Sequence, residues 1–152
     1  MTAILKFYDR AVALVTSGPL QHLTLLFVRV VLAGIFWRSG RTKVEEGSLL
    51  DISDTTRFLF ENDYSGVPLP PDLAAVMATY SEHLFPILLV LGLFTRLSAL
   101  ALLGMTLVIQ FFVYPDAWWP VHSLWVALAL VLIMRGGGAL ALDALLLRWC
   151  KR

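Results

Sequence analysis

Arg29 and Glu82 are ionisable residues in the middle of two predominantly apolar stretches of the sequence. A lone charge at the centre of a bilayer costs about 2.5–3.5 kcal/mol on insertion scales, so such residues are normally paired or hydrated. The two lie at overlapping depth in neighbouring spans, which predicts an ion pair between them. Small residues beside Glu82, such as Ala78, would let another helix approach closely, and Lys43 shares a helical stripe with Arg29. The pair is either a structural clamp or a site for a proton or a quinone headgroup, and both readings stay open.

Further polar residues occur in the same apolar stretches. Tyr80 and His83 accompany Glu82, Gln110 lies in the next stretch, and His122 begins the last one. Gln110 and His122 are expected near the same aromatic turn, where together they would line a polar pocket open to the outside. In the alternative reading, His122 is interfacial and Gln110 is a hydrogen-bonded helix contact. The candidate site residues are Arg29, Lys43, Tyr80, Glu82, His83, Gln110 and His122.

The residue types argue against several other chemistries. His83 is predicted in mid-span and His122 near the outer face, and this difference in depth disfavours a haem held by two histidines. Neither an H-x-x-H nor a C-x-x-C spacing occurs, so no metal site is predicted. Cys150 is the only cysteine, which excludes an internal disulfide and thiol–disulfide catalysis by this chain alone. A formal net charge of +1 provides no basic stripe for nucleic acid.

Membrane-spanning helices must position these residues. Of the 152 residues, 59% are hydrophobic and 15% are charged, and the mean hydropathy is +0.77. Soluble domains carry about 45–50% apolar and about 25% charged residues. Four spans are predicted, at about 20–37, 73–94, 97–114 and 119–134, each covering or nearly covering about 30 Å of hydrocarbon. The predicted fold is an all-α, four-helix membrane bundle in a single domain over residues 1–152.

The segments outside the spans are predicted to be partly helical. Residues 3–17 place apolar and charged side chains on different helical faces, which is typical of an amphipathic helix in the membrane interface. The alternative is an extension of the first span, although Gly18-Pro19 should break it. Residues 38–72 form an acidic outer loop, in which residues 51–60 could form a short helix against the membrane surface.

The basic residues indicate an orientation. In a four-span arrangement one side carries Lys6, Arg10, Arg96, Arg135, Arg148, Lys151 and Arg152. The other side carries Arg38, Arg41, Lys43 and Arg57. Because loops rich in lysine and arginine stay in the cytoplasm, both termini are predicted to be cytoplasmic.

Several sequence blocks resemble the DoxX family of bacterial membrane proteins. Residues 29–43 (RVVLAGIFWRSGRTK) are similar to the family's R-x-x-x-G-x-x-F-x-x-x-G-x-x-K, and residues 91–99 (LGLFTRLSA) to its L-G-L-x-T-R-x-x-A. Val67-Pro68 with Pro70 or Pro71 precedes Glu82, as in the family. Residues 135–143 (RGGGALALD) resemble the ending G-P-G-x-x-S-L-D, with Gly137 and Ala141 in place of the usual proline and serine.

The resemblance implies a multi-pass protein of the bacterial inner membrane and a loose association with redox chemistry. The expected role is a quinone-linked oxidoreductase subunit, or a subunit of a metal or oxidative-stress system, that works with a redox or metal-handling partner protein. No cofactor is evident, and quinone is the one that the resemblance suggests. Residues 112–118 and His122 resemble a branch encoded beside copper-binding modified peptides. The alternative is therefore a small transporter or scaffold for such a peptide, with a structural Arg–Glu pair. The oligomeric state stays open.

Overall fold

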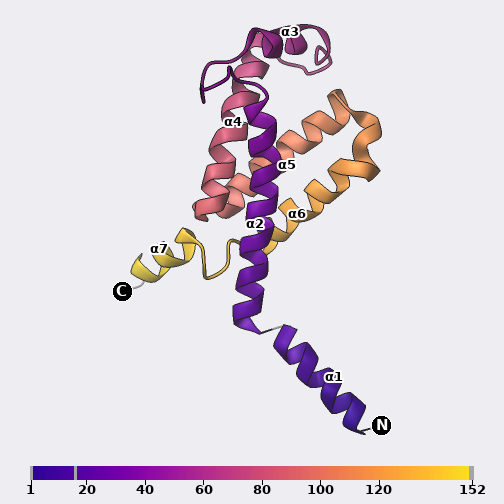
Figure 1. Cartoon of the computed structure of the whole chain (residues 1–152), viewed down its shortest axis with the longest axis vertical. Helices are drawn as coiled ribbons and strands as arrows, with labels where there is room; N and C mark the ends of the chain where they lie inside the picture. Colours follow the sequence, from indigo (N-terminus) through magenta and orange to yellow (C-terminus); the bar gives the residue numbers. More distant parts are fainter. Residues whose placement is uncertain (1, 16, 151–152) are drawn as a thin grey trace.

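The computed structural model describes residues 2–15 and 17–150, which are helical apart from loops and one bridge between Val44 and Ile52. Four segments are long and apolar enough to cross a membrane: α2 (Gly18–Arg41), α4 (Pro71–Leu91), α5 (Thr95–Phe112) and Pro115–Arg135. Figure 1 shows them as a bundle, with α4 beside α2 and with α5 and α6 strongly tilted. The predicted all-α fold with four spans is confirmed, and α2 is longer at both ends than the predicted 20–37.

The tight turn between α4 and α5 depends on Gly92. This residue ends α4 in the left-handed region, with φ 70°. A Cβ atom at residue 92 would also lie 2.9 Å from Cζ of Arg29 and 2.7 Å from Cα of Ala141. Glycine is therefore required for its backbone conformation and for the close approach of the C-terminal segment.

The C-terminal segment forms α7 (Leu142–Cys150), a helix that the sequence analysis does not predict. Asp143 attaches it to the bundle, because its carboxylate accepts hydrogen bonds from the backbone N–H groups of Phe94 and Thr95, each at 2.8 Å. These N–H groups lie at the start of α5, where no intrahelical acceptor is available to them. Asp143 thus acts as the side-chain cap of α5 from a distant part of the sequence.

The fourth span begins irregularly. A 3₁₀ turn (η1, Pro115–Ala117) and a π turn (η2, Trp118–His122) precede α6 (Ser123–Arg135). Pro120 has no backbone N–H to donate, and a proline inside a helix interrupts the regular ladder of α-helical hydrogen bonds. The irregular start places His122 on the buried side of the bundle.

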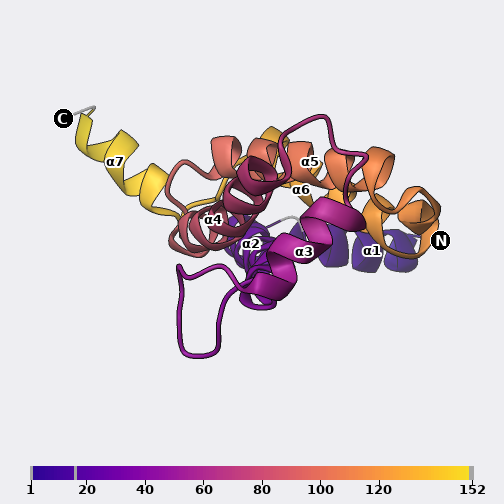
Figure 2. The same ribbon diagram turned by 90° about the horizontal axis from the view of Figure 1, so that it is seen from above.

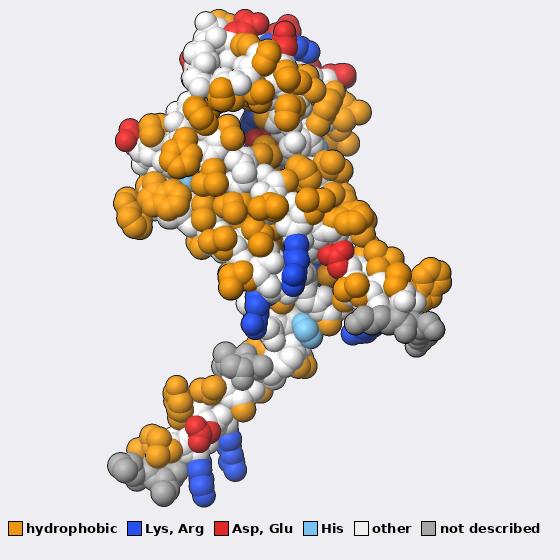
Figure 3. Space-filling model, turned by 180° about the vertical axis from the view of Figure 1, so that it is seen from behind, with side chains coloured by type: hydrophobic (Ala, Val, Ile, Leu, Met, Phe, Trp, Pro, Cys, Tyr) orange, Lys and Arg blue, Asp and Glu red, His pale blue; other side chains and the backbone are white. Residues whose placement is uncertain are grey.

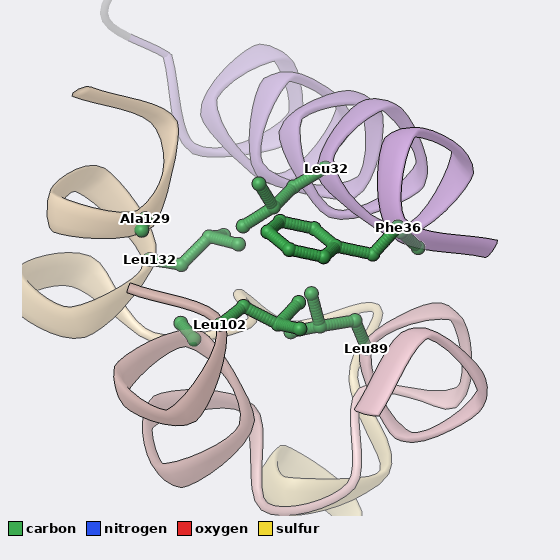
Figure 4. Close-up of a cluster of buried hydrophobic side chains, with 8 residues drawn as sticks. Leu32, Phe36, Leu89, Leu102, Ala129 and Leu132 are labelled. Carbon is green, nitrogen blue, oxygen red and sulfur yellow. The ribbon is translucent and has the colours of Figure 1, made fainter. Parts of the chain in front are cut away.

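The apolar core lies where the four spans meet, and each span contributes to it (Figure 4). Phe36 packs edge-on against Trp125, with 5.4 Å between the ring centroids. The buried members are Leu32, Ala33, Phe36, Leu89, Ala99, Leu102, Ala129 and Leu132.

Two further helices lie outside the core. The predicted amphipathic helix is present as α1 (Thr2–Val15), and the described side chains of residues 4–14 are exposed. One residue of the predicted segment, Thr16, lies outside the described residues, as do Lys151 and Arg152 of the orientation argument. The predicted loop helix is α3 (Asp54–Asn62), which begins at residue 54 rather than 51 and lies across one end of the bundle (Figure 2). We name that end of the molecule the α3 end and the opposite end the α7 end.

Helices α2 and α4 are staggered along their axes. Arg29, midway along α2, contacts the carbonyl groups of Leu89 and Val90 at the last turn of α4. Lys43, just past the end of α2, contacts Glu82 in the middle of α4. The first turns of α2 therefore extend beyond α4 at the α7 end, as Figure 1 shows, and α3 with its flanking loops lies beside the other half of α4.

Candidate functional site

The predicted ion pair between Arg29 and Glu82 is wrong. Leu89, an α4 residue that Arg29 contacts, lies seven positions after Glu82, and this corresponds to about 10 Å along the helix axis. The two ionisable residues therefore lie at different depths in the bundle. Each has its own partners, and the sequence placed them together only because hydropathy does not reveal how far one helix is displaced along another.

Arg29 is 1% exposed and binds backbone carbonyl groups. Its Nε donates to Leu89 O at 2.7 Å and its Nη2 to Val90 O at 2.6 Å. Its Nη1 donates to Gly137 O at 3.0 Å and to Leu140 O at 3.2 Å. The last carbonyl groups of a helix lack intrahelical donors and carry the negative end of its dipole, which explains their affinity for a guanidinium. Arg29 thus joins the end of α4 to the segment between α6 and α7.

Glu82 pairs with Lys43 instead. The Nζ atom of Lys43 lies 2.7 Å from Oε2 of Glu82, whose side chain is 2% exposed. Lys43 also donates to Oγ and to the backbone oxygen of Ser39, at 3.0 Å and 3.5 Å. Lys43 lies just past the end of α2 but continues the helical stripe of Arg29, and this stripe correctly indicated that Lys43 points to a packed face. Sequence reasoning missed Ser39 and assigned Glu82 to the wrong cation.

The Lys43–Glu82 pair lies in a cavity of about 300 Å³ at the α3 end. Most of its walls are apolar, and α3, the loop that follows it, α4, α5 and α6 contribute to them. The apolar lining residues are Phe60, Val67, Leu69, Ala74, Met77, Ala78, Met105, Val108, Ile109, Val113 and Trp125. Its polar lining residues are Ser39, Lys43, Tyr64, Ser81, Glu82, Tyr114 and His122. Figure 3 shows a hollow beneath the α3 end, rimmed largely by hydrophobic side chains, with a basic and an acidic side chain deep inside.

Gln110 and His122 lie together, as the sequence analysis expects. Oε1 of Gln110 lies 2.7 Å from Nδ1 of His122, and Nε2 of Gln110 donates to Pro115 O at 2.6 Å. Only His122 lines the cavity, so Gln110 supports it from behind rather than forming the wall. The irregular turn η2, which a hydropathy profile cannot reveal, aims His122 inward.

Two of the predicted site residues, His83 and Tyr80, do not line the cavity. Nδ1 of His83 lies 2.7 Å from Thr79 O, and its ring packs edge-on against Trp37 with 5.2 Å between centroids. Nε2 of His83 is buried and, within the described residues, has no hydrogen-bond partner. Tyr80 is 43% exposed and its hydroxyl donates to Leu50 O at 3.4 Å. Both residues contact neighbouring segments rather than the cavity.

A pair of tyrosines completes the cavity and was missed by sequence reasoning. The hydroxyl groups of Tyr64 and Tyr114 lie 3.2 Å apart, and their rings meet edge-on with 6.1 Å between centroids. The contact joins the loop after α3 to the residue before η1. Burial, and then the hydrogen bond with Tyr114, raise the pKa of Tyr64 above its ordinary value. The aromatic residues near residue 114 could be recognised in the sequence, but the sequence does not indicate that Tyr114 contacts Tyr64 in the long loop.

The chain matches known proteins over most of its length. The family model for DoxX matches residues 24–115. An uncharacterized protein of Haemophilus influenzae is 32% identical over 138 residues, which cover 86% of this chain and 87% of that protein. No solved structure matches.

Proposed function

The chain belongs to the DoxX family of membrane proteins, and we propose that it acts as a subunit that binds a lipid-soluble quinone for a redox partner protein. The observation that carries this proposal is the cavity at the α3 end, which combines apolar walls with the buried Lys43–Glu82 pair and His122. Ligand sites are typically clefts of about 300–1,000 Å³ with mostly apolar walls and a few polar groups that orient the ligand. The sequence analysis predicts a quinone site at Arg29 and Glu82. We propose instead that Glu82, Lys43 and His122 form the site, because Arg29 does not line the cavity.

The lining residues fit a quinone headgroup. A headgroup is a flat ring with oxygen atoms on opposite sides, and side chains such as Met105 and Ile109 provide the apolar surface for the ring. The hydroxyl group of Ser81 can donate a hydrogen bond to a ring oxygen. Glu82 and His122 can accept hydrogen bonds from the hydroxyl groups of the reduced ring.

The cavity wall also faces the surroundings of the bundle. Met77 on α4 and Val108 on α5 line the cavity although they are 51% and 41% exposed. In a membrane the outer surfaces of these helices contact lipid. A ligand with an isoprenoid or alkyl tail could therefore place its headgroup inside and leave its tail among the lipids. The hydrophobic rim in Figure 3 supports the same route.

We also propose an orientation of the protein in the membrane and a role for it beside its partner protein. The basic residues of α1 and of the α7 end, including Arg96, Arg135 and Arg148, favour a cytoplasmic α7 end in the bacterial inner membrane. The cavity then opens in the outer half of the bilayer. The quinone exchanges electrons and protons there with a partner protein, and this chain supplies the binding site.

Purified protein provides the test. Lipid extracts of the protein, analysed by mass spectrometry, should contain quinone, and the stripped protein should bind added decylubiquinone saturably. Ala78→Phe fills the cavity and should weaken binding at least about tenfold, whereas Ala127→Phe on the exposed face of α6 should leave binding unchanged. Quinone-free extracts together with no saturable binding would overturn the proposal, as would equal binding by the two variants.

A further inference from the structure

We infer that the cavity binds the reduced, hydroxyl-bearing form of its ligand in preference to the oxidised form, so that it is a quinol site rather than a quinone site. This inference rests on the proposed function, because it specifies which form of the proposed ligand the cavity selects. The arrangement that carries it is the hydrogen-bonded series of Pro115, Gln110 and His122 behind the cavity wall.

The Pro115 carbonyl fixes the orientation of the Gln110 side chain. A carbonyl oxygen only accepts hydrogen bonds, so the group of Gln110 that lies 2.6 Å from Pro115 O must be its amide NH₂. The amide oxygen, Oε1, is then the atom that lies 2.7 Å from Nδ1 of His122. Because Oε1 also only accepts, Nδ1 of His122 must carry the proton of this contact.

This contact determines what His122 offers to the cavity. In a neutral imidazole one ring nitrogen carries the proton and the other accepts, and the hydrogen bond at one nitrogen decides the tautomer. With the proton on Nδ1, Nε2 of His122 is an acceptor. His122 lines the cavity, and a ligand there can bond Nε2 only as a hydrogen-bond donor.

Lys43 does not offer the ligand a free hydrogen-bond donor. Its ammonium group has three protons, and its three contacts are Glu82 Oε2 at 2.7 Å, Ser39 Oγ at 3.0 Å and Ser39 O at 3.5 Å. The ionised Glu82 carboxylate only accepts hydrogen bonds. Glu82 and Nε2 of His122 are therefore groups that only accept, whereas the lining hydroxyl groups of Ser39, Tyr64 and Tyr114 can donate or accept.

A quinol donates hydrogen bonds through its hydroxyl groups, whereas a quinone has only carbonyl acceptors. An acceptor that faces another acceptor leaves both groups without a partner in an apolar enclosure. One such contact should favour the quinol by about tenfold. Ser81 can serve either form because its hydroxyl both donates and accepts.

Anaerobic titrations of the purified, quinone-stripped protein with decylubiquinol and decylubiquinone test this inference. Wild-type protein should bind the quinol about tenfold more tightly. His122→Leu should weaken quinol binding and leave quinone binding nearly unchanged, so the preference disappears. His22→Leu, which removes a histidine at the α7 end, should keep the preference.

Gln110→Met tests the tautomer itself. Without Oε1, the proton of His122 is free to move to Nε2, and the preference for the quinol should fall or reverse. Thermal unfolding of each variant, compared with wild type, identifies variants that do not fold. Equal affinity of wild-type protein for both forms would overturn the inference and leave the proposed function standing, whereas binding of neither form would overturn both. A preference that survives in folded His122→Leu would also overturn the inference.

Discussion

Arg29 and Glu82 are both buried ionisable residues, and each is stabilised in a different way. Arg29 has four backbone carbonyl partners at the end of α4 and in the segment before α7. Glu82 has one ammonium partner, Lys43. The first arrangement uses the fixed fork of donors that only a guanidinium has, and the second uses a point charge. The two sites should therefore respond differently to substitution.

Exchanging the charges of Lys43 and Glu82 tests their pairing. Lys43→Glu and Glu82→Lys each place two like charges together and should destabilise the folded protein by about 3–5 kcal/mol, because a buried charge loses its partner. The double variant should recover part of that loss. The measurement is the yield of monodisperse protein in detergent and its thermal stability. A double variant of Arg29→Glu and Glu82→Arg should show no recovery, and recovery there would contradict the geometry.

Replacing Arg29 with lysine tests the carbonyl site. A lysine ammonium cannot reach carbonyl groups on both α4 and the segment 137–140 in the same geometry, so Arg29→Lys should destabilise the protein by about 2 kcal/mol or more. Arg38→Lys, at an exposed position of the same helix, should change stability by less than about 0.5 kcal/mol. Thermal unfolding in detergent measures both, and equal effects would contradict a specific role for Arg29.

At the scale of elements, the contact between α2 and α4 brings Lys43 to Glu82. Gly40 lies in this contact, and a Cβ atom at residue 40 would lie 2.9 Å from Cε1 of His83 and 3.1 Å from Cβ of Glu82. A Cβ atom at Gly34 on the same helix would meet no atom within 4 Å. The close approach at Gly40 therefore sets how far apart the two helices are beside the cavity.

Two alanine substitutions distinguish these glycines. Gly34→Ala should stabilise the protein by up to about 1 kcal/mol, because alanine is the better helix former and has room there. Gly40→Ala should lose that gain and destabilise the protein by about 1 kcal/mol or more, because His83 must move. It should also weaken quinone binding, since Glu82 shifts with α4. Thermal unfolding and quinone titration are the measurements, and equal effects of the two substitutions would contradict the packing argument.

The contact between Tyr64 and Tyr114 should weaken at high pH. Because the pKa of Tyr64 is raised in the folded protein, the unfolded chain loses this proton first as the pH rises. The contribution of the neutral phenol is therefore fully present below about pH 10 and declines above it. Tyrosinate absorbance should show a late-titrating group that Tyr64→Phe removes. A titration unchanged by Tyr64→Phe would contradict the assignment.

At the scale of the whole molecule, the cavity lies at the α3 end, whereas Arg96, Arg135 and Arg148 lie toward the α7 end. This difference leads to the proposed orientation, in which the α3 end faces outward. Cys150 is exposed and serves as a native probe of the α7 end. A matched probe of the α3 end is Asp63→Cys in a Cys150→Ser background, since Asp63 is exposed in the loop after α3.

Labelling of intact cells with a membrane-impermeant maleimide tests the orientation. The cysteine at position 63 should react in intact cells. Cys150 should react only after the membrane is opened, because the α7 end is proposed to be cytoplasmic. Reaction of Cys150 in intact cells together with protection of position 63 would reverse the orientation.

The sequence by itself determined the local features of this protein. The four spans, α1 and α3 follow from apolar length, helical periodicity and breaking residues, and these are properties of contiguous residues. The sequence also identified the buried polar residues, because an ionisable group in an apolar stretch needs a partner whatever that partner is. The contact of Gln110 with His122 could be predicted from the sequence because a short turn joins the two helices that carry them.

Only the tertiary structure decided which partners these residues take. The stagger of α2 on α4 separates Arg29 from Glu82 and brings Lys43 to Glu82, and it depends on close packing at Gly40 between helices distant in sequence. The same stagger leaves half of α4 beside α3, where the cavity forms. Axial displacement between helices changes neither hydropathy nor periodicity, so no single stretch of sequence records it.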